Sequence, residues 1–421
     1  MGGTPNPNCR LSVGDCRLET ETQCADTHNV CMGELAQQQE HDANAVYIND
    51  LAVSSSGRLA LAGRFRGTLD FGGDSQPLVS AETGVNGTDA FVVSIDASGA
   101  AQWSYAYSRN ADDNATGLHF APNGDLVVQG RDATGVFVQR LDVTGNVLWS
   151  DWNANTLAEP GHVGIDNDGR IVLGGSYLGT LNFAGAQLSR GSRAGYLIKL
   201  DGDGNFLWAA DTIPADWLSA TVTGLAVDDE DNIVVVGNGL SDHAITGAFI
   251  QKITSNADAF VATLLPGELT LQSVAVDRNM RVVVAGTFRE KLSYGGQIHE
   301  LSASSSADVW VAQYTRQGEL GWQKALASGT SGATVHSVAV DPFGNVVVVG
   351  NGFQLETSPH SYQALYALRL RPDGSFVWAQ SFDPFSQHSA VGIDNRSNIW
   401  LAGSANVNPP GMYTFLFQIF P

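Results

Sequence analysis

The stretch SVAVDPFGNVVVVG, from Ser337 to Gly350, holds a short strand, a tight turn and a second strand that is apolar throughout. Asp, Pro, Gly and Asn between β-branched runs indicate a β-hairpin. The run from Val346 to Val349 predicts a strand buried on both faces, because neither face carries a polar side chain. A helix is excluded, because Gly and turn residues bound this run after about five residues.

The same pattern occurs seven times along the chain, and each copy ends in glycine. These are Gly63, Gly130, Gly175, Gly237, Gly286, Gly350 and Gly403. Seven repeats of one supersecondary unit predict a repeat architecture rather than several unrelated domains.

A third strand follows each hairpin, with an aromatic residue in one register and a polar residue three positions later, on the opposite face. The aromatic residues are Phe91, Phe137, Tyr196, Phe249, Trp310, Tyr366 and Phe415. The polar residues are Ser94, Arg140, Lys199, Lys252, Gln313, Arg369 and Gln418. We expect the aromatic residues to pack between neighbouring sheets rather than to stack on a ligand.

A fourth strand reads G-x-x-x-W and ends at Trp103, Trp149, Trp208, Trp322 and Trp378, with Val261 at that place in the fourth copy. The seventh copy has no fourth strand before Pro421. Near the start of the chain, Gly33-Glu34-Leu35-Ala36 resembles Gly318-Glu319-Leu320-Gly321 and puts Gln37 in the place of the Trp. We therefore expect an all-β, seven-bladed β-propeller of four-stranded antiparallel blades over residues 33–421, closed by an N-terminal strand.

All four cysteines lie in a separate N-terminal segment, residues 1–32: Cys9, Cys16, Cys24 and Cys31. Their C-x6-C-x7-C-x6-C spacing lacks the close pair typical of zinc sites. An even count beside a cysteine-free body favours two disulfides made in an oxidising compartment. The three possible pairings stay open, as do reduced thiols and an unusual metal site.

The charge balance is strongly acidic: 22 Lys and Arg against 43 Asp and Glu give a net charge of −21. Such a charge repels nucleic acid and anionic lipid, so neither is an expected partner. No run of about 18 apolar residues predicts a membrane span. The chain begins without a signal peptide. Because the cysteines indicate export, we expect a secreted or cell-surface protein, or a lipoprotein, whose signal sequence is not part of this chain.

The repeats resemble those of bacterial β-propellers in large exported and surface-anchored proteins. The matching segments are GTLDFGG from Gly67 to Gly73 with TDAFVVSIDASGAAQW from Thr88, and GTLNFAG from Gly179 to Gly185 with YLIKLDGDGNFLW from Tyr196. The resemblance covers residues 33–421 and implies secretion and a seven-bladed ring, but no common reaction. The G-x-x-x-W turns are also similar to those of quinone-dependent dehydrogenases, whose eighth blade and adjacent cysteines are missing here.

No residue stands out as catalytic, cofactor-binding or metal-ligating. His162, His336 and His388 precede three first strands, which line a propeller's channel, but they stand at different distances from the repeat Asp. We therefore expect no metal site. Two acidic turns, Asp201 to Asn205 and Asp228 to Asn232, resemble parts of calcium loops without the closing glutamate, so ordinary turns are favoured over calcium.

The variable loops all lie on one face of the expected disc, opposite the tight hairpins, and loops on a rigid scaffold are where binding usually resides. With no catalytic motif present, we expect a non-catalytic module that binds a protein or glycan or assembles with itself. The alternative is an extracellular hydrolase or lyase with a site at the channel mouth on the loop face. Carboxylates or histidines with shifted pKa values in the channel favour the enzyme. An aromatic groove, or extensive contact between chains, favours the binding module.

Overall fold

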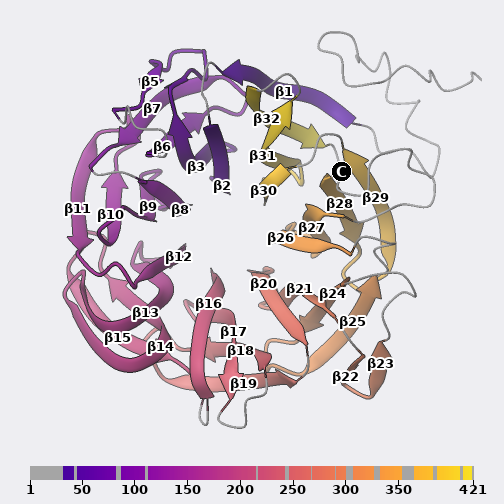
Figure 1. Ribbon diagram of the computed structural model, residues 1–421. Coiled ribbons are helices and arrows are strands. Elements are labelled where there is room, and N and C mark those ends of the chain that lie inside the picture. Colours follow the sequence, from indigo (N-terminus) through magenta and orange to yellow (C-terminus); the bar gives the residue numbers. More distant parts are fainter. Residues whose placement is uncertain are drawn as a thin grey trace, which may run out of the picture.

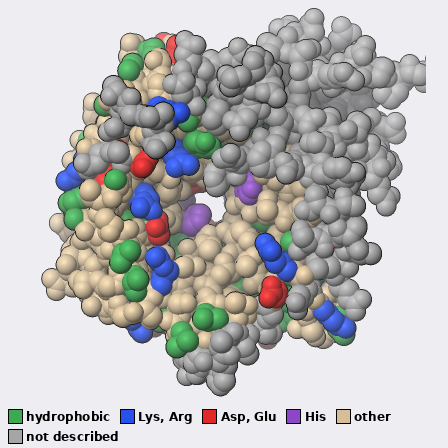
Figure 2. Space-filling model, in the orientation of Figure 1, with side chains coloured by type: hydrophobic (Ala, Val, Ile, Leu, Met, Phe, Trp, Pro, Cys, Tyr) green, Lys and Arg blue, Asp and Glu red, His purple; other side chains and the backbone are tan. Residues whose placement is uncertain are grey.

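The computed structural model shows a closed ring of β-sheets (Figure 1) with an opening at its centre (Figure 2). It describes residues 32–41, 45–81, 87–109, 112–214, 217–241, 246–266, 268–289, 291–299, 307–326, 332–352, 365–382, 386–407 and 411–419. Seven sheets have four antiparallel strands each, so the seven-bladed propeller is confirmed. The expected disulfide-bonded head, residues 1–32 with its four cysteines, lies outside the described residues apart from Met32.

Blades 1 to 4 follow one another along the chain. Blade 1 contains β2 (Ala45–Val53), β3 (Leu59–Arg66), β6 (Asp89–Ile95) and β7 (Ala101–Tyr107). Blade 2 contains β8 (Asn114–Phe120), β9 (Leu126–Arg131), β10 (Val136–Leu141) and β11 (Val147–Asn153). Blade 3 contains β12 (Glu159–Ile165), β13 (Ile171–Phe183), β14 (Ala186–Leu200) and β15 (Phe206–Thr212). Blade 4 contains β16 (Trp217–Val227), β17 (Ile233–Ser241), β18 (Thr246–Ile253) and β19 (Ala259–Pro266).

Blades 5 to 7 complete the ring. Blade 5 contains β20 (Leu269–Val276), β21 (Val282–Phe288), β24 (Asp308–Tyr314) and β25 (Leu320–Leu326). Blade 6 contains β26 (Thr334–Val340), β27 (Val346–Asn351), β28 (Leu365–Leu370) and β29 (Phe376–Phe382). Blade 7 contains β30 (Ser386–Ile393), β31 (Ile399–Val407), β32 (Gly411–Ile419) and β1 (Met32–His41). Two small hairpins, β4 (Thr68–Leu69) with β5 (Leu78–Val79) and β22 (Leu292–Tyr294) with β23 (Gln297–His299), extend blades 1 and 5.

The hydrophobic core consists of layers between neighbouring blades. In blade 6, Val346, Val347, Val348 and Val349 are all fully buried, because alternate side chains enter the layers on either side. The seven third-strand aromatic residues are at most 2 % exposed, which confirms that they pack within the protein. No helix among the described residues has the length and apolarity to cross a membrane.

The glycine that ends each repeat permits a β-bulge in the first strand. In blade 1, a Cβ on Gly63 would lie 1.9 Å from the Tyr47 carbonyl oxygen and 2.9 Å from the Phe91 ring. In blade 6, a Cβ on Gly350 would lie 1.9 Å from the Thr334 carbonyl oxygen. The first strand shifts register next to this glycine in every blade, so the glycine gives the bulged backbone room.

The tryptophan of the G-x-x-x-W motif links each outer strand to the following blade. Four indole nitrogens donate hydrogen bonds to carbonyl oxygens in the next blade's outer turn: Trp103 to Val143 (2.9 Å), Trp149 to Gly202 (3.2 Å), Trp208 to Ser255 (2.9 Å) and Trp322 to Pro372 (3.0 Å). The motif therefore serves the ring's own packing.

The N-terminal strand closes the ring, as expected, but its register differs from the sequence alignment. Strand β1 pairs antiparallel with β32, with Met32 opposite Ile419 and Leu35 opposite Phe417. In other blades the Trp lies opposite the polar residue of the third strand, as Trp149 lies opposite Arg140. In blade 7 that polar residue is Gln418, and the pairing places Glu34 near it instead of Gln37. The expected register was wrong by three residues, because no tight turn joins β32 to β1 and fixes their pairing.

Candidate functional site

The first strands, β2, β8, β12, β16, β20, β26 and β30, surround the central channel (Figure 1). Their bulges lie at one level of the ring, and five of them have a single extra residue, which is polar in every case: Asn49, Thr116, Thr223, Gln272 and His336. The repeat pattern did not single out this set. The signal that could have found it is a polar residue four positions before the end of the first strand.

Two of the three histidines singled out from the sequence bridge neighbouring blades. His162 Nε2 lies 2.9 Å from the Thr223 carbonyl oxygen, and His336 Nδ1 lies 2.9 Å from Ser389 Oγ. His336 is the extra residue of its bulge, whereas His162 shares a wider bulge with Gly161, so the two are not equivalent in the ring. The side chain of His388 lies outside the described residues.

Asp50 occupies the position after the bulge in blade 1. Its Oδ2 accepts a hydrogen bond from the Leu118 amide of blade 2 (2.9 Å), and its Oδ1 accepts one from the Leu51 amide (2.8 Å). Burial raises the pKa of the Asp50 carboxyl, and the nearby His162 and the two amides oppose this only in part. Asp50 also interacts electrostatically with His119 of blade 2.

His119 lies on β8 and its side chain is exposed to solvent. Its Nδ1 is 2.9 Å from the Phe120 carbonyl oxygen, which can only accept, so Nδ1 carries the proton and Nε2 keeps its lone pair. The surrounding strands remove enough water to lower the pKa of His119, against the opposing effects of the Phe120 carbonyl and Asp50. Figure 2 shows histidine side chains on the wall of the central opening.

Metal-site candidates from the sequence have other roles. The described residues hold no group of three or more His, Cys, Asp or Glu side chains arranged to hold a metal ion. In the two acidic turns, Asp201 accepts hydrogen bonds from the amides of Asp203 and Asn205, and Asp228 contacts the Lys252 ammonium at 2.7 Å. The Asp201 contacts are those of an ordinary turn, and Asp228 forms a buried ion pair with the third strand of its blade.

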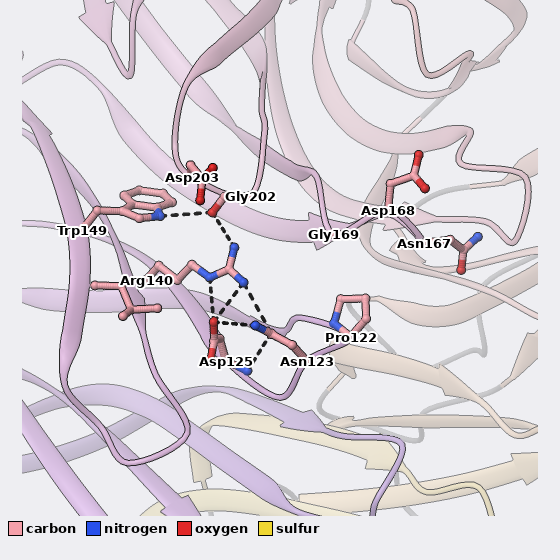
Figure 3. A pocket seen from close by; sticks show the side chains of 11 residues that line it. Pro122, Asn123, Asp125, Arg140, Trp149, Asn167, Asp168, Gly169, Gly202 and Asp203 are labelled. Atoms are coloured by element: carbon pink, nitrogen blue, oxygen red, sulfur yellow. Dashed lines mark hydrogen bonds and ion pairs between the residues drawn. The ribbon is translucent and has the colours of Figure 1, made fainter.

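A cavity of about 680 Å³ lies on the hairpin face between blades 2 and 3 (Figure 3). Figure 3 shows contacts that join the two blades across it: Arg140, which contacts Asp125 at 2.9 Å, and Trp149 both donate to the Gly202 carbonyl oxygen. Because these interactions join the two blades, this cavity is a gap in an interface rather than an active site.

No family model matches the chain, and no curated protein matches it. The bacterial exported propeller family of the sequence analysis is therefore not shown. Some solved structures do resemble this chain. A Dyadobacter fermentans protein of unknown function has 10% identity and a TM-score of 0.46, covering 91% of this chain and 99% of that one.

Two similar solved structures are enzymes. A Synechocystis apocarotenoid oxygenase has 10% identity and a TM-score of 0.44, covering 90% of this chain and 93% of that one. A Xanthomonas campestris gluconolactonase has 14% identity and a TM-score of 0.39, covering 70% of this chain and 82% of that one. At these identities the likeness shows the fold alone.

The expectation of a non-catalytic module is corrected here. It rested on the propeller fold and on the absence of catalytic motifs, yet the solved propellers that resemble this chain include a gluconolactonase and an oxygenase. A fold shared with enzymes and a lack of short motifs do not indicate a protein without catalysis, because residues of a propeller site come from different blades. Asp50 and His119 also lie on strands that surround the channel, and burial shifts the pKa values of both. Such shifts favour the enzymatic alternative.

Proposed function

We propose that the protein is an enzyme of the hydrolase or lyase class, with Asp50 and His119 transferring protons in the central channel. The observation that carries the proposal is the placement of His119: an exposed imidazole on an inner strand, held in one tautomer by the Phe120 carbonyl and lying near the Asp50 carboxyl. Both reaction classes need a base that removes a proton, from water or from carbon, and an acid that protonates the leaving group.

The pKa shifts suit these roles. The lowered pKa of His119 favours the neutral imidazole near pH 7, so Nε2 can accept a proton. The raised pKa of Asp50 lets its carboxyl keep a proton at a higher pH than an exposed aspartate does, and the protonated carboxyl can donate that proton. Neighbouring groups with shifted pKa values are typical of acid–base sites.

The charge of the protein restricts the substrate. A net charge of −21 disfavours the association of anionic polymers with the protein. We therefore propose a neutral or cationic substrate, hydrolysed or cleaved by elimination.

The test is turnover by purified wild-type protein of a panel of chromogenic esters, lactones and neutral glycosides, with product absorbance followed for elimination. We expect His119→Gln to lower kcat/KM at least 100-fold, the usual range for a general base. The matched control is His299→Gln, since His299 lies in the peripheral hairpin β22–β23. Absence of turnover across the panel, or equal turnover by both variants, would contradict the proposal.

We also propose that the protein is exported and related to the bacterial propellers of secreted, lipid-anchored or surface proteins. The support is the sequence alone: four cysteines at the N-terminus and none in the propeller. Intact mass after alkylation, with and without reduction, should differ by four blocked thiols. Four thiols that react without reductant would argue against export.

A further inference from the structure

A second cavity, of about 360 Å³, lies between the outer strand of blade 1 and the two outer strands of blade 2. Tyr105, Tyr107 and Arg109 line one wall, from β7 and the residues that follow it. Gln139 of β10 and Trp152 of β11 line the other. We call this cavity the blade 1–2 groove. Its volume falls within the range of about 300–1,000 Å³ found for small-molecule sites.

Gln139 is the residue that indicates a ligand. The residue is 7% exposed, and its amide forms no hydrogen bond with a described residue. Its amide atoms still reach solvent, so a ligand can replace the water bound to them. Because Gln139 lines the groove, a ligand there can reach both its donor and its acceptor.

The aromatic rings of the groove are held in fixed positions. Tyr107 stacks on Phe137 with ring centroids 4.0 Å apart and an interplanar angle of 18°. The Trp152 indole nitrogen donates to Asp132 Oδ2 at 3.0 Å, and the Arg109 guanidinium lies 3.8 Å from the centre of the Trp152 ring. Rings fixed in this way offer a preorganised binding wall that loses little entropy on binding.

We propose that the blade 1–2 groove binds pyranose rings of a neutral oligosaccharide. A pyranose presents C–H groups on its faces, which pack on aromatic rings, and hydroxyls on its rim, which need both donors and acceptors. Tyr105 and Tyr107 supply the aromatic rings on which the C–H faces can pack. Gln139 supplies a donor and an acceptor, exposed Asp151 accepts, and exposed Arg109 donates.

The charge of the protein and the polarity of the groove narrow the choice of ligand. The net charge of −21 disfavours an acidic polysaccharide. A lipid chain would displace water from the Gln139 amide without replacing its hydrogen bonds. The groove lies at the periphery and shares no residue with the channel site, so its occupancy does not depend on the proposed catalysis.

The test titrates the full chain with cellohexaose, xylohexaose, chitohexaose and maltohexaose, by calorimetry and by tryptophan fluorescence. Gln139→Leu removes the amide with little change in volume, and Gln251→Leu is the matched control. Gln251 occupies the same third-strand register in blade 4, one residue before Lys252 as Gln139 precedes Arg140, but it does not line the groove.

For the oligosaccharide that binds, we expect Gln139→Leu to weaken affinity at least tenfold while Gln251→Leu leaves it unchanged. Trp152→Ala should abolish the fluorescence response. The melting temperature of Gln139→Leu without ligand should equal or exceed that of wild type, because the amide has no protein hydrogen bond to lose. Failure of all four oligosaccharides to bind at millimolar concentration, or equal effects of the two Gln variants, would overturn the proposal.

Discussion

The ammonium group of Lys199 lies 2.8 Å from the carboxylate of Asp166, and neither side chain is more than 2% exposed. The polar residue of the third strand thus meets the acid at the end of the first strand of its own blade. The same contact joins Lys252 to Asp228 and Arg369 to Asp341. In blade 2, where Ala121 replaces the acid, Arg140 pairs instead with Asp125, on the other side of the turn.

Breaking the buried pair in blade 3 should destabilise the protein strongly. Asp166→Asn keeps the size of the side chain but leaves the Lys199 ammonium buried without a countercharge. We expect a loss of about 3–5 kcal/mol in the free energy of unfolding. Urea denaturation followed by tryptophan fluorescence measures it.

Two further variants show whether the buried charge is the cause. Asp166→Asn combined with Lys199→Met should recover most of the loss, because the unpaired charge is removed. Arg316→Ala breaks an ion pair with Glu230 in which both side chains are nearly half exposed, and it should cost less than about 1 kcal/mol. Similar losses for Arg316→Ala and Asp166→Asn would show that burial is not the deciding factor.

Asp228 should make stability depend on pH in the acid range. Burial raises its pKa, but the Lys252 ammonium and Asn232 outweigh burial and hold the pKa of the carboxyl below 3.8. As pH falls, the Asp228 carboxyl is therefore protonated at a higher pH in the unfolded chain than in the folded protein. The stabilisation is therefore complete at pH 7 and is lost as pH falls below 4 through the lowered folded pKa.

The comparison of wild type with Asp228→Asn isolates this contribution. Their difference in free energy of unfolding should be largest and constant from pH 6 to 7, and should shrink as pH falls from 4 toward 2. A difference that stays constant down to the lowest pH would mean that Asp228 is not ionised in a stabilising contact.

Gly204 should not tolerate alanine. It has φ of +85°, and a Cβ there would lie 3.0 Å from the Trp149 ring of the preceding blade. The backbone conformation alone costs alanine about 1–2 kcal/mol, and displacement of the ring adds to this. Gly191→Ala is the control, because a Cβ at Gly191 meets no atom within 4 Å and its φ is not in the left-handed region. Equal melting temperatures for the two variants would show that the Trp149 contact does not constrain Gly204.

Closure of the ring by β1 predicts different effects for two N-terminal truncations. Deletion of residues 1–31 leaves β1 intact, whereas deletion of residues 1–42 removes it and exposes the edge of β32. Phe415 and Phe417 of β32 are at most 4% exposed in the closed ring. We expect a lower melting temperature and aggregation for the longer deletion alone, because an unpaired apolar edge strand templates association. Indistinguishable melting curves would mean that β1 adds nothing to closure.

The number of blades, their strand order and their buried faces could be predicted from the repeats along the chain. These features are local and repeat seven times, so each copy supports the assignment of the others. The apolar run Val346–Val349 could only be a strand buried on both faces, and the tight turn before it fixed its partner. The shared register of Phe91, Tyr196 and Phe415 likewise identified one packed face.

The side chains from different copies that meet in space could not be predicted from the repeats, because their contacts depend on how the blades pack. Asp50 and His119 belong to two blades, and the walls of the blade 1–2 groove come from two blades as well. The bulges whose polar residues contact the next blade, such as Asn49 and His336, arise from backbone pairing, which composition does not reveal. The register of β1 on β32 was also beyond the sequence, because no turn joins them and pairing across the closed ring depends on the packed faces of both strands.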